Sequence, residues 1–481
     1  MNTLVWFRHD LRLSDHPALH QAVQSDSAIL PLYIWEPQEE KPWQLGGASR
    51  WWLHHALVDL DRQLKQAGSK LIVRRGPALQ TLQQIIKEGH VSSVVWTRRY
   101  EPHTIKRDEV IKRTLKEQGI DVESYNGSLI HEPMSIKNKE GKPYQVYTPF
   151  WKCYQLQDPP RTPLQSPKKI SAPENWPTSL EIISLKLLPT IKWDTGFYQT
   201  WTPSEEAARQ SLNHFCQLAL TRYADQRDLP GTVGTSQLSP FLHFGQISPN
   251  QAWHAVQSLR AEAKHSDKEF QRQSEVYLKE LVWREFAYHL LYHFPQTPTQ
   301  PLRPEFARFP WKDNAKLLRA WQRGQTGYPI VDAGMRQLWT TGWMHNRIRM
   351  VVASFLVKHL LIPWQRGAEW FWDTLVDADL ASNTLGWQWT AGCGADAAPY
   401  FRIFNPMQQG ERFDADGAYV RRWVPELAKI PARYIHSPWT APGGVLYDAG
   451  IKLGKNYPYP IVQHPEARTK ALAAYAAMRG T

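Results

Sequence analysis

Cysteine is scarce in this chain of 481 residues, which limits the chemistry that the chain can carry. Cys153, Cys216 and Cys393 lie far apart in the sequence. They cannot supply the four thiolates of an iron–sulfur cluster or a zinc ribbon, and they indicate no disulfide framework. We therefore expect no structural metal.

Long hydrophobic runs and nucleotide-binding glycine motifs are also missing. No stretch of about 18 uncharged apolar residues occurs and the N-terminus shows no signal-peptide pattern, so we expect a cytoplasmic protein that binds no membrane. Gly46 and Gly47 are not followed by the spacing of a dinucleotide fingerprint, which argues against an NAD site.

Positive charge and tryptophan are both abundant. The chain has 57 Lys and Arg against 45 Asp and Glu, a net charge of +12, and it contains 23 tryptophans. A basic protein favours a polyanionic partner, although many basic proteins bind no nucleic acid. Tryptophan fills cores, but it also stacks on bases and flavins.

The first 130 residues alternate short β-branched or aromatic runs with amphipathic stretches. The runs predict strands at 4–7, 28–35, 70–74, 93–97 and 121–125, and the stretches predict helices at 50–67, 77–88 and 104–118. This alternation predicts a doubly wound, Rossmann-like α/β domain with a parallel sheet, which we place at residues 1–130.

Proline and then helical periodicity dominate the rest of the chain. Eleven prolines lie between residues 133 and 203, so residues 131–203 are predicted to be a linker. From residue 204 to 481 we expect an all-helical domain, in which Ser248 caps a helix that Pro249 begins. Its helices are predicted at 205–220, 249–261, 276–292, 314–323, 331–340, 344–360 and 366–375.

One of these helices has an unusual predicted face. At helical spacing Trp343, Asn346, Arg347 and Met350 share one side, whereas the opposite side is apolar. Such a helix packs its apolar side into the core. Its amide and guanidinium side chains then face another group inside the protein. We expect that partner to be a ligand.

Three further groups suggest chemistry, and each has an ordinary alternative. The hydroxyls of segment 234–239, just before a helical run, favour a diphosphate, but Ser and Thr are also common helix caps. Glu280 and Trp283 share a helix face, or they are a surface acid beside a core indole. Arg349 and Asp377 lie in apolar surroundings that favour an ion pair, or they are simple surface charges.

Several long motifs resemble those of the photolyase/cryptochrome family. They are Val5-Trp-Phe-Arg-His-Asp-Leu-Arg12, Trp343-Met-His-Asn-Arg347, Asp377-Ala-Asp-Leu-Ala381, Gly386-Trp-Gln-Trp389 and Asp396-Ala-Ala-Pro-Tyr-Phe-Arg-Ile-Phe-Asn-Pro406. The match runs in family order along nearly the whole chain. It is nearest to the class III photolyases, which repair cyclobutane pyrimidine dimers (CPDs).

The resemblance implies an α/β antenna domain followed by an all-helical domain that binds FAD and damaged DNA. In this family, reduced FAD excited by near-UV or blue light donates an electron to a CPD that has been flipped out of the DNA. We therefore expect a monomeric DNA-repair lyase that acts on UV-damaged DNA, duplex or single-stranded.

Matched position by position, the family's FAD contacts fall on Tyr223, Thr235, Ser236, Gln237, Leu238, Ser239, Arg284, Asn346, Arg349, Asp377, Asp379 and Asn383. Tyr223 and segment 235–239 match the diphosphate seat, with Arg284 as a further phosphate contact, and Gln237 replaces the arginine of some bacterial members. Asn383 matches the residue that faces flavin N5, where plant cryptochromes carry aspartate. A neutral amide there does not oppose an anionic reduced flavin as a carboxylate would.

The family's lesion contacts fall on Arg227, Glu280, Trp283, Asn346, Arg347, Met350 and Trp389. A protonated Glu280 would donate a hydrogen bond to a thymine carbonyl. Members that repair (6-4) photoproducts have histidines where Asn346 and Met350 stand, which favours CPDs as the substrate. We assign catalytic roles to Glu280 and Asn383.

Two further sites follow from the resemblance. Trp387, Trp364 and Trp311 match a catalytic chain of rings that carries electrons to the flavin, although core packing is an ordinary role for them. Contacts to an antenna of 5,10-methenyltetrahydrofolate fall on Trp35, Glu39, Glu40 and Glu101. An 8-hydroxy-5-deazaflavin or an empty antenna site is the alternative.

A cryptochrome, which signals as a photoreceptor without repair, is the alternative function. Asn383 argues against it, and so does the end of the sequence at Thr481, soon after the shared region, where we expect no signalling tail. A dark flavin oxidoreductase is disfavoured because the sequence shows no recognisable NAD site.

Overall fold

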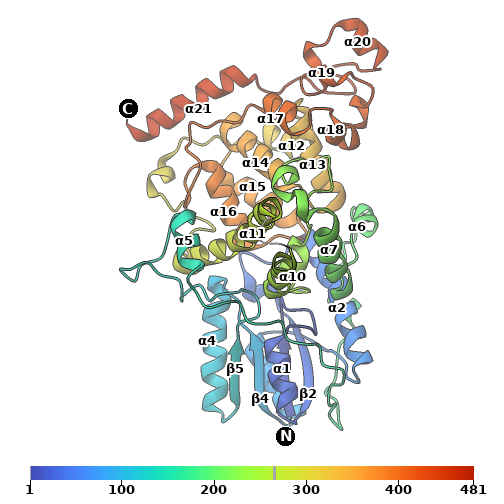
Figure 1. Cartoon of the computed structure of the whole chain (residues 1–481), viewed down its shortest axis with the longest axis vertical. Coiled ribbons are helices and arrows are strands. Elements are labelled where there is room, and N and C mark those ends of the chain that lie inside the picture. The colour runs from blue at the N-terminus through green and yellow to red at the C-terminus, as the bar shows by residue number, and fades with distance from the viewer. Residues whose placement is uncertain (1, 264–266, 481) are drawn as a thin grey trace.

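The computed structural model describes residues 2–263 and 267–480. Figure 1 shows a domain built on a β-sheet around the N-terminus and a larger helical body that carries the C-terminus. No helix in these two ranges is long and apolar enough to cross a membrane.

The N-terminal domain is built on a five-stranded parallel sheet in the order β3-β2-β1-β4-β5. The strands are β1 (Asn2–Phe7), β2 (Ala28–Trp35), β3 (Ile72–Arg75), β4 (Val91–Thr97) and β5 (Asp121–Tyr125). The helices between them are α1 (Pro17–Gln24), α2 (Gly47–Gln66), α3 (Ala78–Glu88) and α4 (Pro102–Glu117). The predicted fold class is confirmed; α1, which is short, was not predicted.

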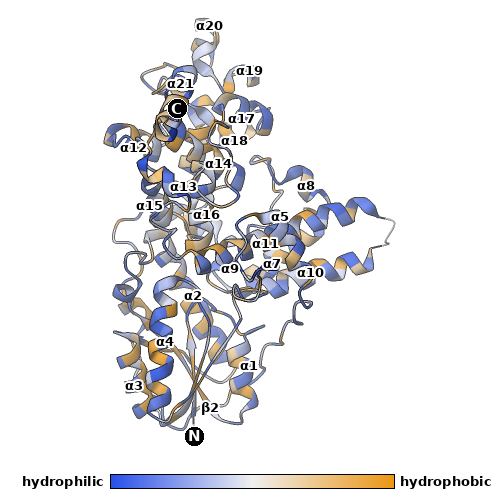
Figure 2. Ribbon diagram, turned by 90° about the vertical axis from the view of Figure 1, so that its left-hand side faces the viewer, coloured by the Kyte–Doolittle hydropathy of each residue, from blue (hydrophilic) through white to orange (hydrophobic). Residues whose placement is uncertain are grey.

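Strand β1 shows why the sheet takes helices on both faces. Leu4 and Trp6 belong to a hydrophobic cluster with α3 and α4, whereas Val5 and Phe7 belong to another with α1 and α2. Successive side chains of a strand point to opposite faces, so an unbroken apolar run needs a cover on each side. Figure 2 shows α3 and α4 on one side of the sheet and α1 on the other.

The remaining helices form the body that carries the candidate site. They are α5 (Tyr147–Tyr154), α6 (Thr195–Thr200), α7 (Glu205–Leu218), α8 (Tyr223–Gln226), α9 (Ser239–His243), α10 (Pro249–Glu262), α11 (Lys268–His293), α12 (Ala315–Gln322), α13 (Pro329–Thr341), α14 (Asn346–Ser354), α15 (Trp364–Thr374), α16 (Leu380–Ala391), α17 (Pro406–Phe413), α18 (Ala418–Trp423), α19 (Ala432–Ile435), α20 (Gly443–Asp448) and α21 (His464–Arg479). Ser248 caps α10 in a capping box and Pro249 begins the helix, as predicted. Within the predicted linker, α5 packs its buried Phe150 and Tyr154 against α11.

The prediction of one helix over residues 344–360 is wrong at both ends. α14 begins at Asn346 because the His345 side chain accepts a hydrogen bond from the Arg347 N–H and caps the helix. Trp343 therefore lies outside the helix and not on its face, held in a turn by hydrogen bonds with the Thr341 hydroxyl. After Ser354 the chain continues as a π-helical turn, Phe355–His359.

Gly46 and Gly47, which carry no dinucleotide fingerprint, instead join the two domains. A Cβ atom on Gly46 would lie 2.3 Å from the Trp372 carbonyl oxygen, so only glycine allows this approach. The Gly47 N–H donates to Asp373 Oδ1 at 2.8 Å. The start of α2 is thereby fixed against the end of α15, in the helical body.

Candidate functional site

A cavity of about 160 Å³ lies where α14, α15 and α16 meet. Its lining includes residues that the sequence predicted as ligand contacts, namely Asn346, Arg349, Met350, Asp377, Asp379, Asn383 and Trp387. Residues from separate helices and from the loop before α16 thus converge on one space.

Arg349 and Asp377 form an ion pair on the cavity wall. Arg349 Nη2 donates to Asp377 Oδ2 at 2.7 Å, and its Nε donates to the Met344 carbonyl at 2.8 Å. The Asp377 side chain is only 2% exposed, and its Oδ1 has no hydrogen-bond partner among the described residues. A buried acceptor without a donor is costly, so the wall offers a site for an N–H group of a ligand.

Asp379 caps α16 and is held by groups that the sequence did not reveal. Its carboxylate accepts hydrogen bonds from the Ser382 N–H at 2.8 Å and from the Tyr288 hydroxyl, and it lies 3.5 Å from His243 Nδ1. Burial alone would raise the pKa of Asp379, but its bonds to His243 and Tyr288 and the charge of Arg284 hold that pKa well below its usual range. The cavity edge therefore keeps a negative charge at neutral pH.

Neither Tyr288 nor His243 was predicted from the sequence, although the position of Tyr288 on its helix offered a signal. Tyr288 lies four residues after Arg284 and eight after Glu280, so it shares their face of α11. His243 had no comparable signal, since it lies in the short helix α9 and meets Asp379 only through the tertiary fold.

Asn383 and Gly386 shape the floor of the cavity. Asn383 Nδ2 donates to the Ala368 carbonyl at 3.1 Å, which fixes the amide and leaves its oxygen for the cavity. A Cβ atom on Gly386, one turn later, would meet no heavy atom within 4 Å. The surface of α16 therefore borders open space in which a flat ring can lie.

Segment 235–239 is connected to this cavity through Trp343. Trp343 Nε1 donates to Ser239 Oγ at 3.2 Å, and the Arg349 guanidinium lies 6.0 Å from the centre of the Trp343 ring. Thr235 and Ser236 are partly buried, whereas Gln237 is exposed with φ 51°. Leu238 is buried in the core.

Two predicted phosphate contacts have protein partners of their own. Arg284 Nη1 donates to the Ser128 carbonyl at 2.8 Å, and its guanidinium lies 4.9 Å from the centre of the Tyr288 ring. Tyr223 packs edge-on against Tyr277. Arg284 therefore reaches back toward the first domain instead of lining the cavity.

The predicted polar lesion contacts take part in two ion pairs, which join the segment just after α8 to α11 and to α14. Arg227 Nη1 donates to Glu280 Oε1 at 2.5 Å, and Arg347 Nη2 donates to Asp228 Oδ2 at 2.7 Å. Burial lowers the pKa of Arg227, but the Glu280 charge more than offsets this and the pKa lies above its ordinary value. Glu280 is thus paired with Arg227 in this structure.

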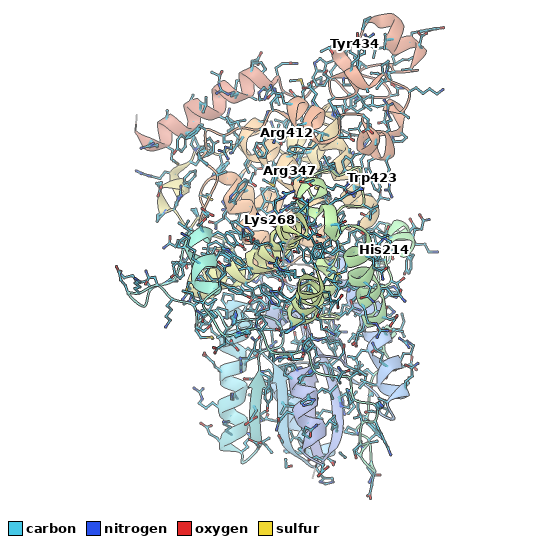
Figure 3. The ribbon with its side chains drawn as sticks, in the orientation of Figure 1. His214, Lys268, Arg347, Arg412, Trp423 and Tyr434 are labelled. Carbon is cyan, nitrogen blue, oxygen red and sulfur yellow. The ribbon has the colours of Figure 1, made fainter. Side chains whose placement is uncertain are left out.

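A second arginine lies beside this group on α17. The guanidiniums of Arg347 and Arg412 lie 4.5 Å and 5.1 Å from the centre of the Phe413 ring. Figure 3 shows the two labelled arginines next to each other on one face of the molecule. Together they form a positive patch next to the predicted lesion contacts.

The aromatic lesion contacts differ in their surroundings. Trp283 on α11 stacks face to face on Tyr147, with ring centres 3.7 Å apart and an interplanar angle of 6°. Trp389 on α16 is half-buried. Neither ring lines the cavity itself, whose lining includes the apolar side chain of Met350.

The three tryptophans of the predicted electron chain share one hydrophobic cluster. Trp387, at the cavity, and Trp364 are each 2% exposed, whereas Trp311 is partly exposed at the cluster's edge. Gly367 makes room for Trp387, since a Cβ atom there would lie 2.0 Å from its ring. Trp387 also makes an edge-on contact with Trp321, a ring that the sequence did not single out.

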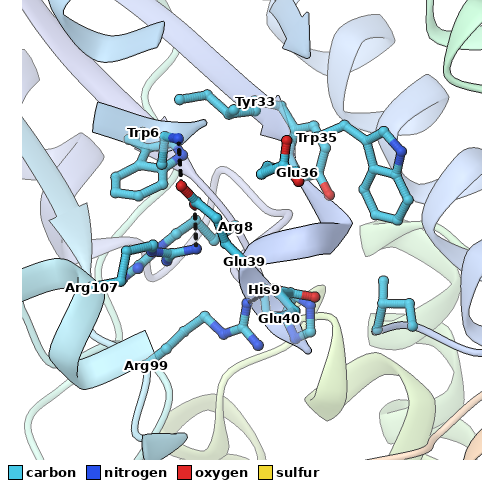
Figure 4. A pocket seen from close by; sticks show the side chains of 13 residues that line it. Trp6, Arg8, His9, Tyr33, Trp35, Glu36, Glu39, Glu40, Arg99 and Arg107 are labelled. Atoms are coloured by element: carbon cyan, nitrogen blue, oxygen red, sulfur yellow. Dashed lines mark hydrogen bonds and ion pairs between the residues drawn. The ribbon is translucent and has the colours of Figure 1, made fainter. Parts of the chain in front are cut away.

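The predicted antenna residues meet in the first domain, but their charges are already paired. Arg99 bridges Glu40 and Glu101 at 2.8 Å and 2.9 Å, and Arg107 lies 3.7 Å from Glu39. Burial would raise the pKa of Glu101, but Arg99 lowers it to about 2. Figure 4 shows Arg99 and Arg107 facing Glu39 and Glu40, with Trp35 at the other end of the pocket.

A larger groove of about 1010 Å³, which none of the predicted residues lines, lies on the other side of α15. The rings of Trp339 and Trp370 in its wall are nearly parallel, with centres 5.9 Å apart and an interplanar angle of 5°. Four arginines also line it: Arg319, Arg323, Arg336 and Arg422. Trp370 lines the groove while the next residue, Phe371, lines the cavity.

The cavity residues fit a flavin. Two buried polar atoms on its wall, Asp377 Oδ1 and Trp387 Nε1, lack hydrogen-bond partners among the described residues, so they are free for a ligand. A flavin ring presents N–H and carbonyl groups along one edge, which an Asp, an Arg and an amide complement. The open space over Gly386 leaves room for the flat ring.

Comparison with known proteins agrees with this geometry. Residues 277–477 match the family model described as the FAD binding domain of DNA photolyase, and residues 3–168 match the one described as DNA photolyase. A deoxyribodipyrimidine photo-lyase from Agrobacterium fabrum is 50% identical over 479 residues, covering 99% of this chain and 98% of that protein.

Solved structures and plant relatives give the same result. The crystal structure of a class III photolyase from Agrobacterium tumefaciens superimposes with a TM-score of 0.95 at 50% identity, covering 100% of this chain and 98% of the other. Cryptochrome-1 of Arabidopsis thaliana is 38% identical over 486 residues, covering 99% of this chain and 70% of that protein. The chain belongs to the photolyase/cryptochrome family.

Proposed function

We propose that this chain repairs cyclobutane pyrimidine dimers in DNA in a light-driven reaction that depends on reduced FAD. The observation that carries the proposal is the single cavity at which a flavin-compatible wall, Arg349 and Asp377, meets Asn346 and Met350. The full-length similarity to a deoxyribodipyrimidine photo-lyase supports the same reaction.

Reduced FAD, when bound and excited by light, supplies the electron that opens the dimer and accepts it back afterwards. Asp377 Oδ1 would accept a hydrogen bond from the flavin edge, while its Oδ2 pairs with Arg349. Asn383 contributes a neutral amide to the cavity, so it adds no negative charge beside a reduced flavin. The arginines beside Phe413 bind phosphates and draw the damaged strand toward the cavity.

The test is to give purified protein with reduced flavin two oligonucleotides, one with a CPD and one with a (6-4) photoproduct, in light and in darkness. We expect the CPD to disappear in light only and the (6-4) product to persist. If the CPD also persists in light, the protein is not a repair enzyme for this lesion. Affinity for the damaged duplex should fall steeply with salt, because phosphate contacts release counterions.

We also propose that the antenna is 5,10-methenyltetrahydrofolate and that it binds in the groove beside Trp339 and Trp370. A folate has a flat ring and an anionic tail, which suit the parallel indoles and the arginines of the groove, of which Arg336 also pairs with Glu426 at 2.8 Å. In the first-domain pocket, Arg99 and Arg107 already pair with Glu40 and Glu39, so these arginines are less available to an anionic tail. Because only α15 separates the groove from the cavity, the two chromophores would lie close enough for energy transfer.

Extraction of the heated protein, followed by chromatography, identifies the chromophore. We expect folate from the wild type and from Glu39→Gln, and a much lower yield from Trp339→Ala. Loss of folate from Glu39→Gln with retention in Trp339→Ala would favour the pocket in the first domain. Recovery of a deazaflavin would refute the folate proposal.

A further inference from the structure

Trp283 is held by a neighbour that the sequence did not connect with the site. The Tyr147 ring lies parallel to the Trp283 ring, with centres 3.7 Å apart, and both rings meet the edge of Phe286. Tyr147 is buried, whereas Trp283 remains partly exposed. One face of the indole is therefore covered by Tyr147, and the other is available for a ligand.

Tyr147 is itself fixed at both ends. Its hydroxyl donates to the Lys279 carbonyl at 2.8 Å, one turn before Trp283 on the same helix. Its backbone N–H donates to Asp396 Oδ2 at 3.4 Å, and the Asp396 N–H donates to the Gln145 carbonyl at 3.0 Å. Asp396 has φ 44°, a backbone conformation that the turn imposes. A ring anchored in this way is held in one position and does not open and close over the site.

Such an anchor restricts the rotation of the indole. A binding group that is already held in its bound orientation loses less conformational entropy when the ligand arrives, and it binds more tightly for that reason. Burial, together with the charge of Glu280, raises the pKa of the Tyr147 hydroxyl, so Tyr147 remains a neutral hydrogen-bond donor at physiological pH.

We propose that Tyr147 is a positioning residue for lesion recognition: by stacking on one face of Trp283, it holds the opposite face toward the flipped dimer. The proposal rests on the repair function above, in which Trp283 contacts the lesion. It assigns to α5, in the predicted linker, a part in distinguishing damaged from undamaged DNA. An aromatic pair of this kind contributes about 2- to 12-fold in binding.

The test compares Tyr147→Phe with Tyr147→Leu in protein that carries flavin. The phenylalanine keeps the stack, so its Kd for a CPD oligonucleotide should stay within about twofold of the wild type. The leucine removes the stack, so its Kd should rise about 2- to 12-fold, while the Kd for the undamaged oligonucleotide stays constant. Repair per bound lesion at saturating DNA should not change, because the electron donor is untouched.

A purely structural role for Tyr147 would give a different pattern. In a Trp283→Leu background, Tyr147→Leu should cause no further loss of CPD affinity, because the ring that it positions is gone. A loss of equal size in that background would overturn the proposal, as would equal weakening for damaged and undamaged DNA. Tighter CPD binding by Tyr147→Leu would also overturn it, because Tyr147 would then occupy the lesion's place.

Two further measures keep the outcome clear. If Tyr147→Leu loses flavin, Tyr147→Met, which fills more of the buried volume without a ring, replaces it in the same comparison. Binding is measured in darkness and separately from repair. Wild-type protein that binds the CPD oligonucleotide without repairing it would therefore refute the proposed function and leave the role of Tyr147 testable.

Discussion

Removal of Arg349 should cost far more stability than removal of an exposed arginine. Asp377 is 2% exposed and accepts its one side-chain hydrogen bond among the described residues from Arg349 at 2.7 Å. Arg349→Ala leaves a buried carboxylate without its counter-charge, and breaking a buried pair in this way costs about 3–5 kcal/mol. We therefore expect Arg349→Ala to destabilise the helical body by about that amount.

Arg366 on α15 provides a matched control. It pairs with Glu369 at 3.3 Å, but the two side chains are 48% and 58% exposed. Exposed pairs contribute about 0–1 kcal/mol, so Arg366→Ala should cost little. Urea unfolding followed by circular dichroism measures both variants, and the flavin content of each is determined from its visible absorption.

A double variant separates the pair from its surroundings. When Asp377→Asn is added to Arg349→Ala, neither member of the pair carries a charge, so part of the lost stability should return. A coupling energy of about 0.5–3 kcal/mol is expected for two groups in direct contact. The reasoning is refuted if Arg349→Ala costs no more than Arg366→Ala, or if the two changes in the pair are additive.

Three further variants test other parts of the molecule. Gly367→Ala places a Cβ atom 2.0 Å from the Trp387 ring, so overpacking should cost about 1–3 kcal/mol and lower the flavin-to-protein absorbance ratio. Burial raises the pKa of Glu285 to about 7, above the unfolded value of about 4.3, so the unfolding free energy should fall as the pH rises between these values, and Glu285→Gln should flatten that slope in urea titrations. Glu280→Gln should lower the CPD repair yield per bound flavin, whereas Glu275→Gln, an exposed acid paired with Lys279 on the same helix, should not; equal yields would contradict the role of Glu280.

The sheet and the main helices were predictable because their signals are local. The apolar runs of the five strands and the Ser248-Pro249 start of α10 depend on residues that adjoin one another in the chain. Helix α16 was not predicted, because its interior position removes the contrast between a polar and an apolar side. The predicted helix face that included Trp343 was wrong for a different reason. The helical periodicity of the side chains continues through His345, but the His345 side chain caps the helix, and α14 begins only at Asn346.

The candidate site was predictable residue by residue, but its partners were not. The acids of the predicted antenna pocket were identified from the sequence. Glu101 lies two residues from its partner Arg99, but Glu40 lies 59 residues before Arg99, and no local pattern links them. Trp339 and Trp370 lie on different helices, and no local pattern indicates that their rings become parallel. Pairing between distant segments decides whether a set of charges is free to bind a ligand.

Helix α11 shows how one element can couple the proposed lesion site, the proposed flavin site and the first domain. Glu280 accepts a hydrogen bond from Arg227 at the lesion end, and Tyr288, two turns later, donates to Asp379 at the cavity. Between them, Glu285 accepts hydrogen bonds from the backbone N–H groups of Ile130 and His131 at 3.0 Å and 3.1 Å. These three attachments fix the rotation of α11 about its axis, because a helix that turns to improve one contact must weaken the other two. A change that frees the first domain from Glu285 should therefore also alter the flavin and lesion contacts, although it lies in neither site.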